Sequence, residues 1–139
     1  MSWFESRSTK EKKSALKNAV AVMMSDGEIS DSELAMLAVI CRRLGLNLRV
    51  LKEILKNPEK IHFVVPRDNQ EKIFQLIDIV FMMMADGKVD DKEMNLCKAI
   101  ASGFSFNPAI IDRLLTAITE SIQKGNDRSQ TAEAVLSIL

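Results

Sequence analysis

The sequence has little of several residue types that mark specialised folds. It contains no tyrosine, only two cysteines and three prolines, and aromatic residues make up 5% of the chain. The cysteines, Cys41 and Cys97, lie within apolar helical patterns and have no CxxC spacing. We therefore interpret them as free buried thiols in a reducing compartment.

Charge of one sign is not in excess either. The 139 residues include 19 basic and 19 acidic residues, so the formal charge is near zero. Proteins that bind nucleic acid or an anionic membrane carry a basic footprint, which this balance argues against. The main basic run, KEKKSALK at 10–17, is explained by a solvated helix start. We expect no nucleic-acid partner.

Long apolar runs are also missing. The longest, at 79–85, falls far short of the ~18 residues that a membrane helix needs. The first 13 residues lack the apolar stretch of a secretory signal. These absences predict a soluble, cytoplasmic protein, with peripheral membrane association through partners left open.

Helical periodicity dominates what the sequence does contain. Strand-like alternation is confined to residues 61–65, which end at Pro66. The pattern predicts an all-α fold, a single-domain bundle of about seven helices. The expected helices are 10–25, 31–44, 48–56, 69–85, 91–104, 108–124 and 129–138.

The chain also repeats itself at an offset of sixty residues. Residues 16–55 align with residues 76–115, for example Leu16 with Leu76. A constant offset over three predicted helices suggests duplication and a pseudo-twofold bundle. The predicted parts are repeat one at about 10–56, a linker at 57–68, repeat two at about 69–124 and a C-terminal cap helix at about 128–139.

The two copies are most alike at a helix junction, MMSDGEISDSEL at 23–34 and MMADGKVDDKEM at 83–94. The glycine of each copy can take the positive φ that closes a helix. Ser30 with Glu33, and Asp90 with Glu93, have the spacing of a capping box, in which each residue satisfies the other's backbone amide. Helix capping explains most of the motif without a ligand.

Capping does not explain Asp26 and Asp86. Each is expected at a helix C-terminus, where a carboxylate meets the negative end of the helix dipole at a cost of up to about 1 kcal/mol. The same unfavourable placement at two matched positions suggests a compensating partner. A local turn hydrogen bond is one candidate partner, and a cation is the other.

The junction also matches the second half of a calcium-binding EF-hand loop. The first half fails, because Val22 and Met24 stand where ligands belong, as do Met82 and Met84 in the second copy. A standalone EF-hand is therefore disfavoured, whereas one cation shared by both turns is not. An all-carboxylate set suits Ca, Mg or Mn. The candidate ligands are Asp26, Glu33, Asp86, Asp90 and Glu93.

These two signatures resemble the TerB-like tellurite-resistance family, and the resemblance covers most of the chain. It implies an all-helical bacterial protein of two related halves that binds metal through acidic residues. It further implies a role in tellurite and general stress resistance at the inner membrane. By motif position, the resemblance assigns the acidic roles to Asp26, Glu33, Asp86 and Glu93. The first copy departs from the second by having Ser30 where the second has Asp90.

The leading functional expectation is a non-enzymatic TerB-like module that binds a divalent cation and joins a stress-response assembly of proteins. The alternative is a helical protein-interaction module whose acidic motifs are only helix caps. An enzyme using a carboxylate pair is the third class, and it would need a pocket with shifted carboxylate pKa values. The sequence shows no catalytic constellation, since its single histidine, His62, has no visible partner.

Overall fold

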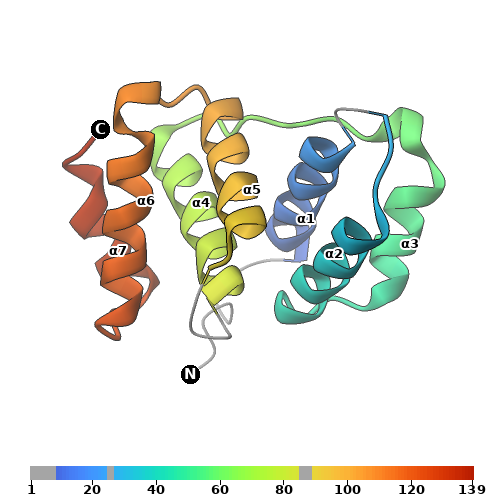
Figure 1. Ribbon diagram of the computed structural model, residues 1–139, viewed down its shortest axis with the longest axis horizontal. Coiled ribbons are helices and arrows are strands. Elements are labelled where there is room, and N and C mark those ends of the chain that lie inside the picture. Colours follow the sequence, from blue (N-terminus) through green and yellow to red (C-terminus); the bar gives the residue numbers. More distant parts are fainter. Residues whose placement is uncertain (1–8, 25–26, 85–88) are drawn as a thin grey trace. The chain divides into compact units, whose positions relative to one another are not determined.

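A computed structural model describes residues 9–24, 27–84 and 89–139 of the chain (Figure 1). Its regular elements are helices, and these described residues include no strand. The all-α prediction is therefore confirmed. The elements are α1 (Thr9–Met23), α2 (Asp31–Arg43), α3 (Leu48–Lys56), the 3-10 turn η1 (Pro58–Lys60), α4 (Asn69–Met83), α5 (Asp91–Gly103), α6 (Pro108–Gln123) and α7 (Arg128–Leu136).

The helix starts agree with the sequence-based ranges better than the helix ends do. Helices α2 to α6 begin at the predicted residue, whereas α1 and α7 each begin one residue earlier. Six helices end one or two residues before the predicted position, and only α3 ends where expected. The strand-like residues 61–65 form no regular element.

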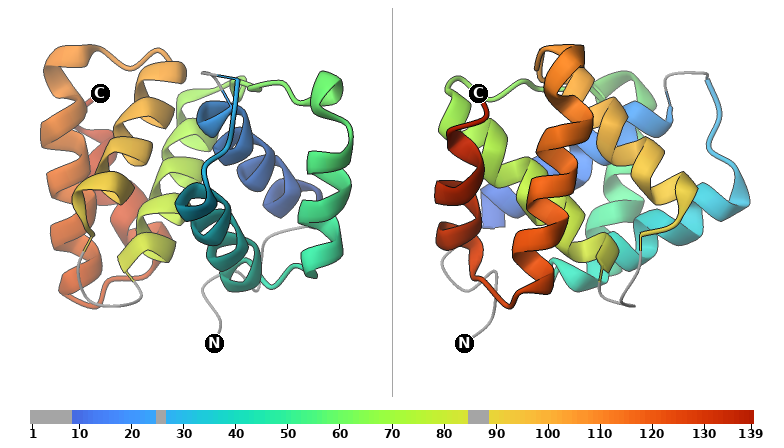
Figure 2. Two further views of the ribbon diagram at one scale, coloured as in Figure 1. Left: turned by 45° about the vertical axis from the view of Figure 1, so that its right-hand side comes forward. Right: turned by 60° about the vertical axis from the view of Figure 1, so that its left-hand side comes forward.

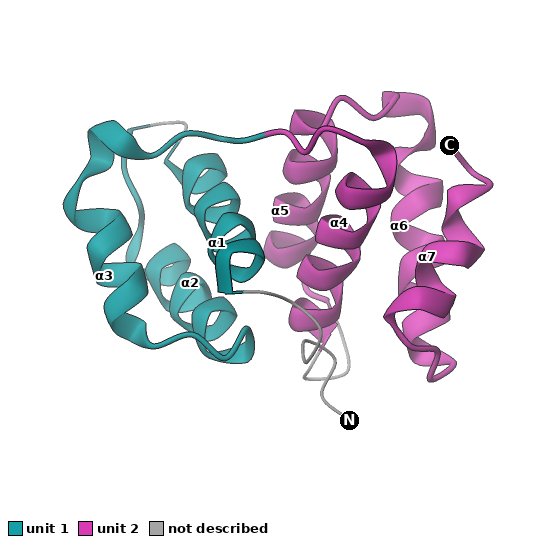
Figure 3. Cartoon of the chain, turned by 180° about the vertical axis from the view of Figure 1, so that it is seen from behind, with its two compact units in different colours: residues 1–64 teal, residues 65–139 magenta. Residues whose placement is uncertain are grey.

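The chain divides into two compact units, residues 1–64 and 65–139, which Figure 3 colours separately. The division falls inside the predicted linker. Each unit is described by itself below.

The first unit contains α1, α2 and α3. Helix α2 packs against both α1 and α3, whereas α1 and α3 contact each other less. Fully buried aliphatic side chains on these helices include Leu16, Leu37 and Ile40. Burying one such side chain contributes about 1.5–3 kcal/mol, so these residues explain why the three helices stay together.

The second unit contains α4 to α7. Its last helix, α7, packs along both α4 and α6, and the views of Figure 2 agree on this placement. Thr131, Ala132 and Val135 form the buried side of α7. Helix α7 therefore covers a face of the unit that α4 and α6 build together.

Corresponding helices of the two units begin sixty residues apart: α1 and α4, α2 and α5, α3 and α6. Their closing turns also correspond. Leu46 N donates to Cys41 O at 3.0 Å after α2, and Phe106 N donates to Ala101 O at 3.3 Å after α5. The left-handed residue of this turn is Gly45 (φ 78°) in one unit and Ser105 (φ 65°) in the other. A side chain in that conformation costs about 1 kcal/mol, so the second turn carries strain that the first avoids.

Among the described residues, no helix is both long and apolar enough to cross a bilayer.

Candidate functional site

The acidic turns were the predicted site, and three of their five candidate ligands lie within the described residues. Glu33 is in the first turn of α2, and Glu93 is in the first turn of α5. Asp90 is the N-cap of α5. Asp26 and Asp86 lie outside the described residues. The structure therefore gives the geometry of the capping residues and leaves a shared cation as a prediction.

Both predicted capping boxes are present. Ser30 N donates to Glu33 Oε1 at 2.9 Å, and Glu33 N donates to Ser30 Oγ at 3.2 Å. Asp90 N donates to Glu93 Oε1 at 3.1 Å, and Glu93 N donates to Asp90 Oδ1 at 2.7 Å. Each box satisfies two backbone donors that the start of a helix leaves without partners. The described acidic side chains thus stabilise helix starts.

Within the described ranges, no group of three or more His, Cys, Asp or Glu side chains is arranged to hold a metal ion. The two aspartates that capping does not explain fall outside these ranges. The capping contacts therefore account for Glu33, Asp90 and Glu93, and they do not bear on Asp26 or Asp86.

A buried ion pair fastens α7 to α4 in the second unit. Arg128 Nε donates to Asp78 Oδ1 at 2.9 Å, and the two side chains are 16% and 1% exposed. The guanidinium carbon lies 4.1 Å from the centre of the Phe74 ring, within the range of a cation–π interaction. Ser121 of α6 and Thr131 of α7 share a 2.9 Å hydrogen bond. Arg128 and Thr131 thus tie the last helix to α4 and α6 respectively.

The first unit buries a polar side chain at the position sixty residues before Asp78. Asn18 Nδ2 donates to Val64 O at 2.9 Å, and Val64 N donates to Asn18 Oδ1 at 2.8 Å. Asn18 is 1% exposed. The Asn18 amide therefore binds the backbone of the segment that follows α3. At the matching position of the second unit, Asp78 binds Arg128, the first residue of α7, the helix that follows α6.

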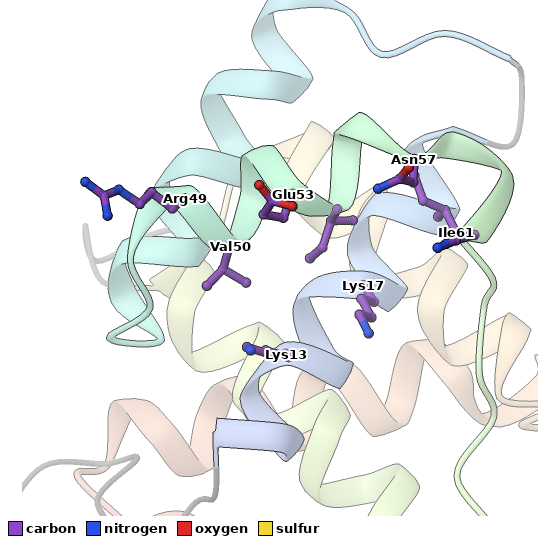
Figure 4. Close-up of a pocket in the computed structure, with 9 residues that line it drawn as sticks. Lys13, Lys17, Arg49, Val50, Glu53, Asn57 and Ile61 are labelled. Atoms are coloured by element: carbon purple, nitrogen blue, oxygen red, sulfur yellow. The ribbon is translucent and has the colours of Figure 1, made fainter.

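Sequence reasoning missed a groove in the first unit, here called the basic groove. It has a volume of about 380 Å³ and lies between α1, α3 and η1. Figure 4 shows Lys13 and Lys17 on α1 opposite Val50 of α3, with Asn57 and Ile61 toward one end and Arg49 toward the other. Its lining comprises four basic residues, one acidic residue, three aliphatic residues and an amide: Lys13, Lys17, Arg49, Lys60, Glu53, Val50, Ile54, Ile61 and Asn57.

A second hollow adjoins the basic groove and shares Lys13 and Lys17 with it. Its volume is about 410 Å³, and its other lining residues include Ser14, Asn18 and Val64. Lys13 and Lys17 are exposed, whereas Val50, Ile54 and Ile61 are half-buried. The groove thus combines an aliphatic floor with cationic walls, a combination suited to an amphipathic, negatively charged ligand.

The basic groove could have been noticed from the repeat. At the offset of sixty residues, Lys13 and Lys17 align with Ile73 and Ile77, which are fully buried in the second unit. A change from buried isoleucine to exposed lysine indicates that the same helix face is covered in one unit and open in the other. The charges of residues 10–17 alone predict a solvated helix start, and the difference from the second unit is visible only when the two copies are aligned.

Both cysteines are free and buried. Burial raises the pKa of the Cys97 thiol to about 12, with a further contribution from the negative charge of Glu93. Burial also raises the pKa of Cys41, whose Sγ lies 3.4 Å from the acceptor Asn47 O. Neutral thiols are poor nucleophiles and poor metal ligands, so neither cysteine has the environment of a reactive site.

Comparison of the chain with family models, with curated proteins and with solved structures gives no match.

Proposed function

We propose that this protein is a non-enzymatic helical module that works by binding another protein, and that the basic groove of the first unit is its binding surface. The observation that carries the proposal is an open groove of about 380 Å³ whose aliphatic floor lies between cationic walls. Protein segments with apolar anchors are recognised in such grooves. The acidic turns then serve as helix caps, the role that the contacts of Glu33 and Glu93 support.

The proposal includes the finer features read from the sequence. We regard the chain as one helical domain made by duplication of a three-helix repeat, with α7 as an added cap. Three pairs of helix starts separated by sixty residues support this reading. We further propose, on the resemblance of its two motifs to the TerB-like family, that the protein takes part in a cytoplasmic stress-response assembly in a bacterium.

A selection from displayed peptides that is unbiased in charge and in secondary structure tests the binding proposal. The full chain is expected to enrich peptides that bind it but do not bind the variant Val50→Glu, because that change puts a charge on the aliphatic floor. The matched control is Ile110→Glu, the counterpart of Val50 on α6, which should leave their binding unchanged. If every enriched peptide binds both variants equally, the groove is not the binding surface.

Divalent-cation binding at the acidic turns is the second candidate function. It is favoured by the occurrence of Asp26 and Asp86 at matched positions that capping leaves unexplained. Ca, Mg or Mn would be held by oxygens of these aspartates with Glu33, Asp90 and Glu93. Such a site requires the two turns to contribute to one ion.

Melting the protein in EDTA and then in Mg, Ca or Mn tests this second candidate. Binding to the native state alone, at a hundred times the dissociation constant, adds about 2.7 kcal/mol and raises the melting temperature by several degrees. The rise should disappear in Asp26→Ala/Asp86→Ala and in Glu33→Gln/Glu93→Gln. The second variant removes two carboxylates but keeps the caps, as Gln130 shows by accepting from Asp127 N at 2.9 Å. A wild-type protein that melts identically in EDTA and in every cation has no such site.

A further inference from the structure

The face shared by α4 and α6 in the second unit corresponds to the face shared by α1 and α3 in the first, and the two faces differ in what covers them. In the second unit, α7 covers the face that α4 and α6 share. Arg128 of α7 contacts Phe74 and Asp78, and Thr131 of α7 contacts Ser121. These three partner positions define where a helix sits on that face.

The corresponding positions in the first unit line the open hollows. Sixty residues before Phe74, Asp78 and Ser121 stand Ser14, Asn18 and Ile61. Ser14 and Asn18 line the hollow beside the basic groove, and Ile61 lines the groove itself. In the first unit no helix follows α3 onto this face, because α3 ends at Lys56 and residues 61–64 are not helical. The chain contacts the face at Asn18, through the hydrogen bond from Asn18 to Val64. The counterparts of the α7 contacts therefore border open hollows in the first unit, and Lys13, Lys17, Val50 and Ile54 line the same hollows.

The charge of this face indicates what fits it. Four basic residues and one acidic residue, Glu53, line the groove. Over the whole of 9–24 and 48–61 the sequence has eight basic and three acidic residues, in a chain whose totals are equal. Lys13 and Lys17 can lay their aliphatic stems along an apolar stripe while their amino groups meet carboxylates at its edges. Uncharged or basic helices lack that second set of contacts.

Resting on the proposed function, we infer that the partner segment is an acidic amphipathic helix that lies in the basic groove as α7 lies on α4 and α6. Helix α7 has nine residues and α3, which supplies most of the groove floor, also has nine, so about two and a half helical turns of the partner make contact. Apolar residues at a spacing of three and four would face Val50, Ile54 and Ile61. Glutamates or aspartates beside that stripe would meet Lys13, Lys17 and Arg49.

Three labelled peptides of about 14 residues test the inference on the full chain, since that length exceeds three helical turns. One is an acidic amphipathic helix, the second has its glutamates replaced by lysines, and the third is a scramble of the first. We expect the acidic helix to bind at least about tenfold more tightly than the other two, with binding that weakens as salt is added. Amide chemical shifts should change along α1 and α3.

Charge reversal supplies the decisive comparison. Lys13→Glu/Lys17→Glu should weaken binding of the acidic peptide by about tenfold or more and improve binding of the lysine peptide. Lys92→Glu/Lys124→Glu makes the same change in net charge at two exposed positions of the second unit and should leave both affinities within about twofold. All four lysines are exposed, and melting curves verify that the variants fold.

Several outcomes would overturn the inference. Equal losses in the two charge-reversed variants would show unspecific attraction, and equal binding of all three peptides would remove the charge argument. Binding of anionic lipid vesicles with none of the peptides would make the groove a membrane contact. The selection from displayed peptides could instead yield basic or extended peptides whose binding is lost in Val50→Glu. The groove would then still bind protein segments, but the inference of an acidic helical partner would be wrong.

Discussion

Replacing Arg128 with alanine is expected to lower the free energy of unfolding by about 3 kcal/mol. The change removes the guanidinium that donates to Asp78 Oδ1 at 2.9 Å and leaves a carboxylate that is 1% exposed. Breaking a buried ion pair from one side costs about 3–5 kcal/mol, because the remaining buried charge loses an attraction that offset its desolvation. We take the lower figure because Arg128 keeps some contact with water.

Urea unfolding followed by circular dichroism measures this loss. Lys98→Ala is the matched control, since it breaks the 3.4 Å pair of Lys98 with Asp112 on the surface of the same unit. Exposed pairs contribute at most about 1 kcal/mol, so the free energy of unfolding of the control should lie within about 1 kcal/mol of wild type. Asp78→Leu/Arg128→Met should be less destabilised than Arg128→Ala, because it removes both charges together. An Arg128→Ala variant as stable as the control would show that the ion pair does not hold α7 in place.

Native Cys97 is expected to react with a thiol reagent at least a thousandfold more slowly than an exposed cysteine. The thiolate is the reactive form, and a pKa of about 12 against the ordinary 9.0 makes it about a thousandfold rarer at neutral pH. The side chain is also fully buried, so the reagent reaches it only after the helix opens. Labelling of the Cys41→Ala variant, which leaves one thiol, measures the rate with and without urea.

The same thiol makes the folded state less favourable at high pH. Between about 9 and about 12 the thiol is ionised in the unfolded chain but protonated in the folded one. The unfolded state then binds fewer protons, so the free energy of unfolding falls as the pH rises through this window. Comparing Cys41→Ala with Cys41→Ala/Cys97→Ala at pH 8 and at higher pH isolates the contribution. Labelling of folded Cys97 at the rate of an exposed thiol would contradict both expectations.

Helix starts were predictable because their chemistry is local. Ser30, Asn47, Asp90 and Asn107 each precede a helix and accept a hydrogen bond from one of its first amides. A short polar side chain at that place marks a boundary to within one residue. Helix ends were predicted too late, because apolar residues such as Leu44 and Phe104 continue the periodicity into the closing turn, where the helix has already ended.

The contacts between residues close in sequence were predictable, whereas the contacts between residues far apart in sequence were not. The capping boxes depend on residues three positions apart, so spacing alone predicted the contacts of Glu33 and Glu93 correctly. The basic groove depends on Lys13 meeting Val50 across two helices, and no local pattern encodes that meeting. Asp78 and Arg128 are fifty residues apart, and their pairing is visible only once α7 is folded onto α4.

The hydrogen bonds of Asn18 have a consequence for how the sequence can drift. The amide of Asn18 binds the N–H and the C=O of residue 64, and the Val64 side chain is 56% exposed. Recognition of a backbone does not depend on which side chain it carries, so position 64 can accept almost any amino acid except proline, which has no N–H. At the start of α7, Arg128 is bound through its own guanidinium, and no other residue type supplies a planar cation that both pairs with Asp78 and stacks on Phe74. Among homologous chains, we therefore expect position 64 to vary in amino acid and position 128 to stay arginine.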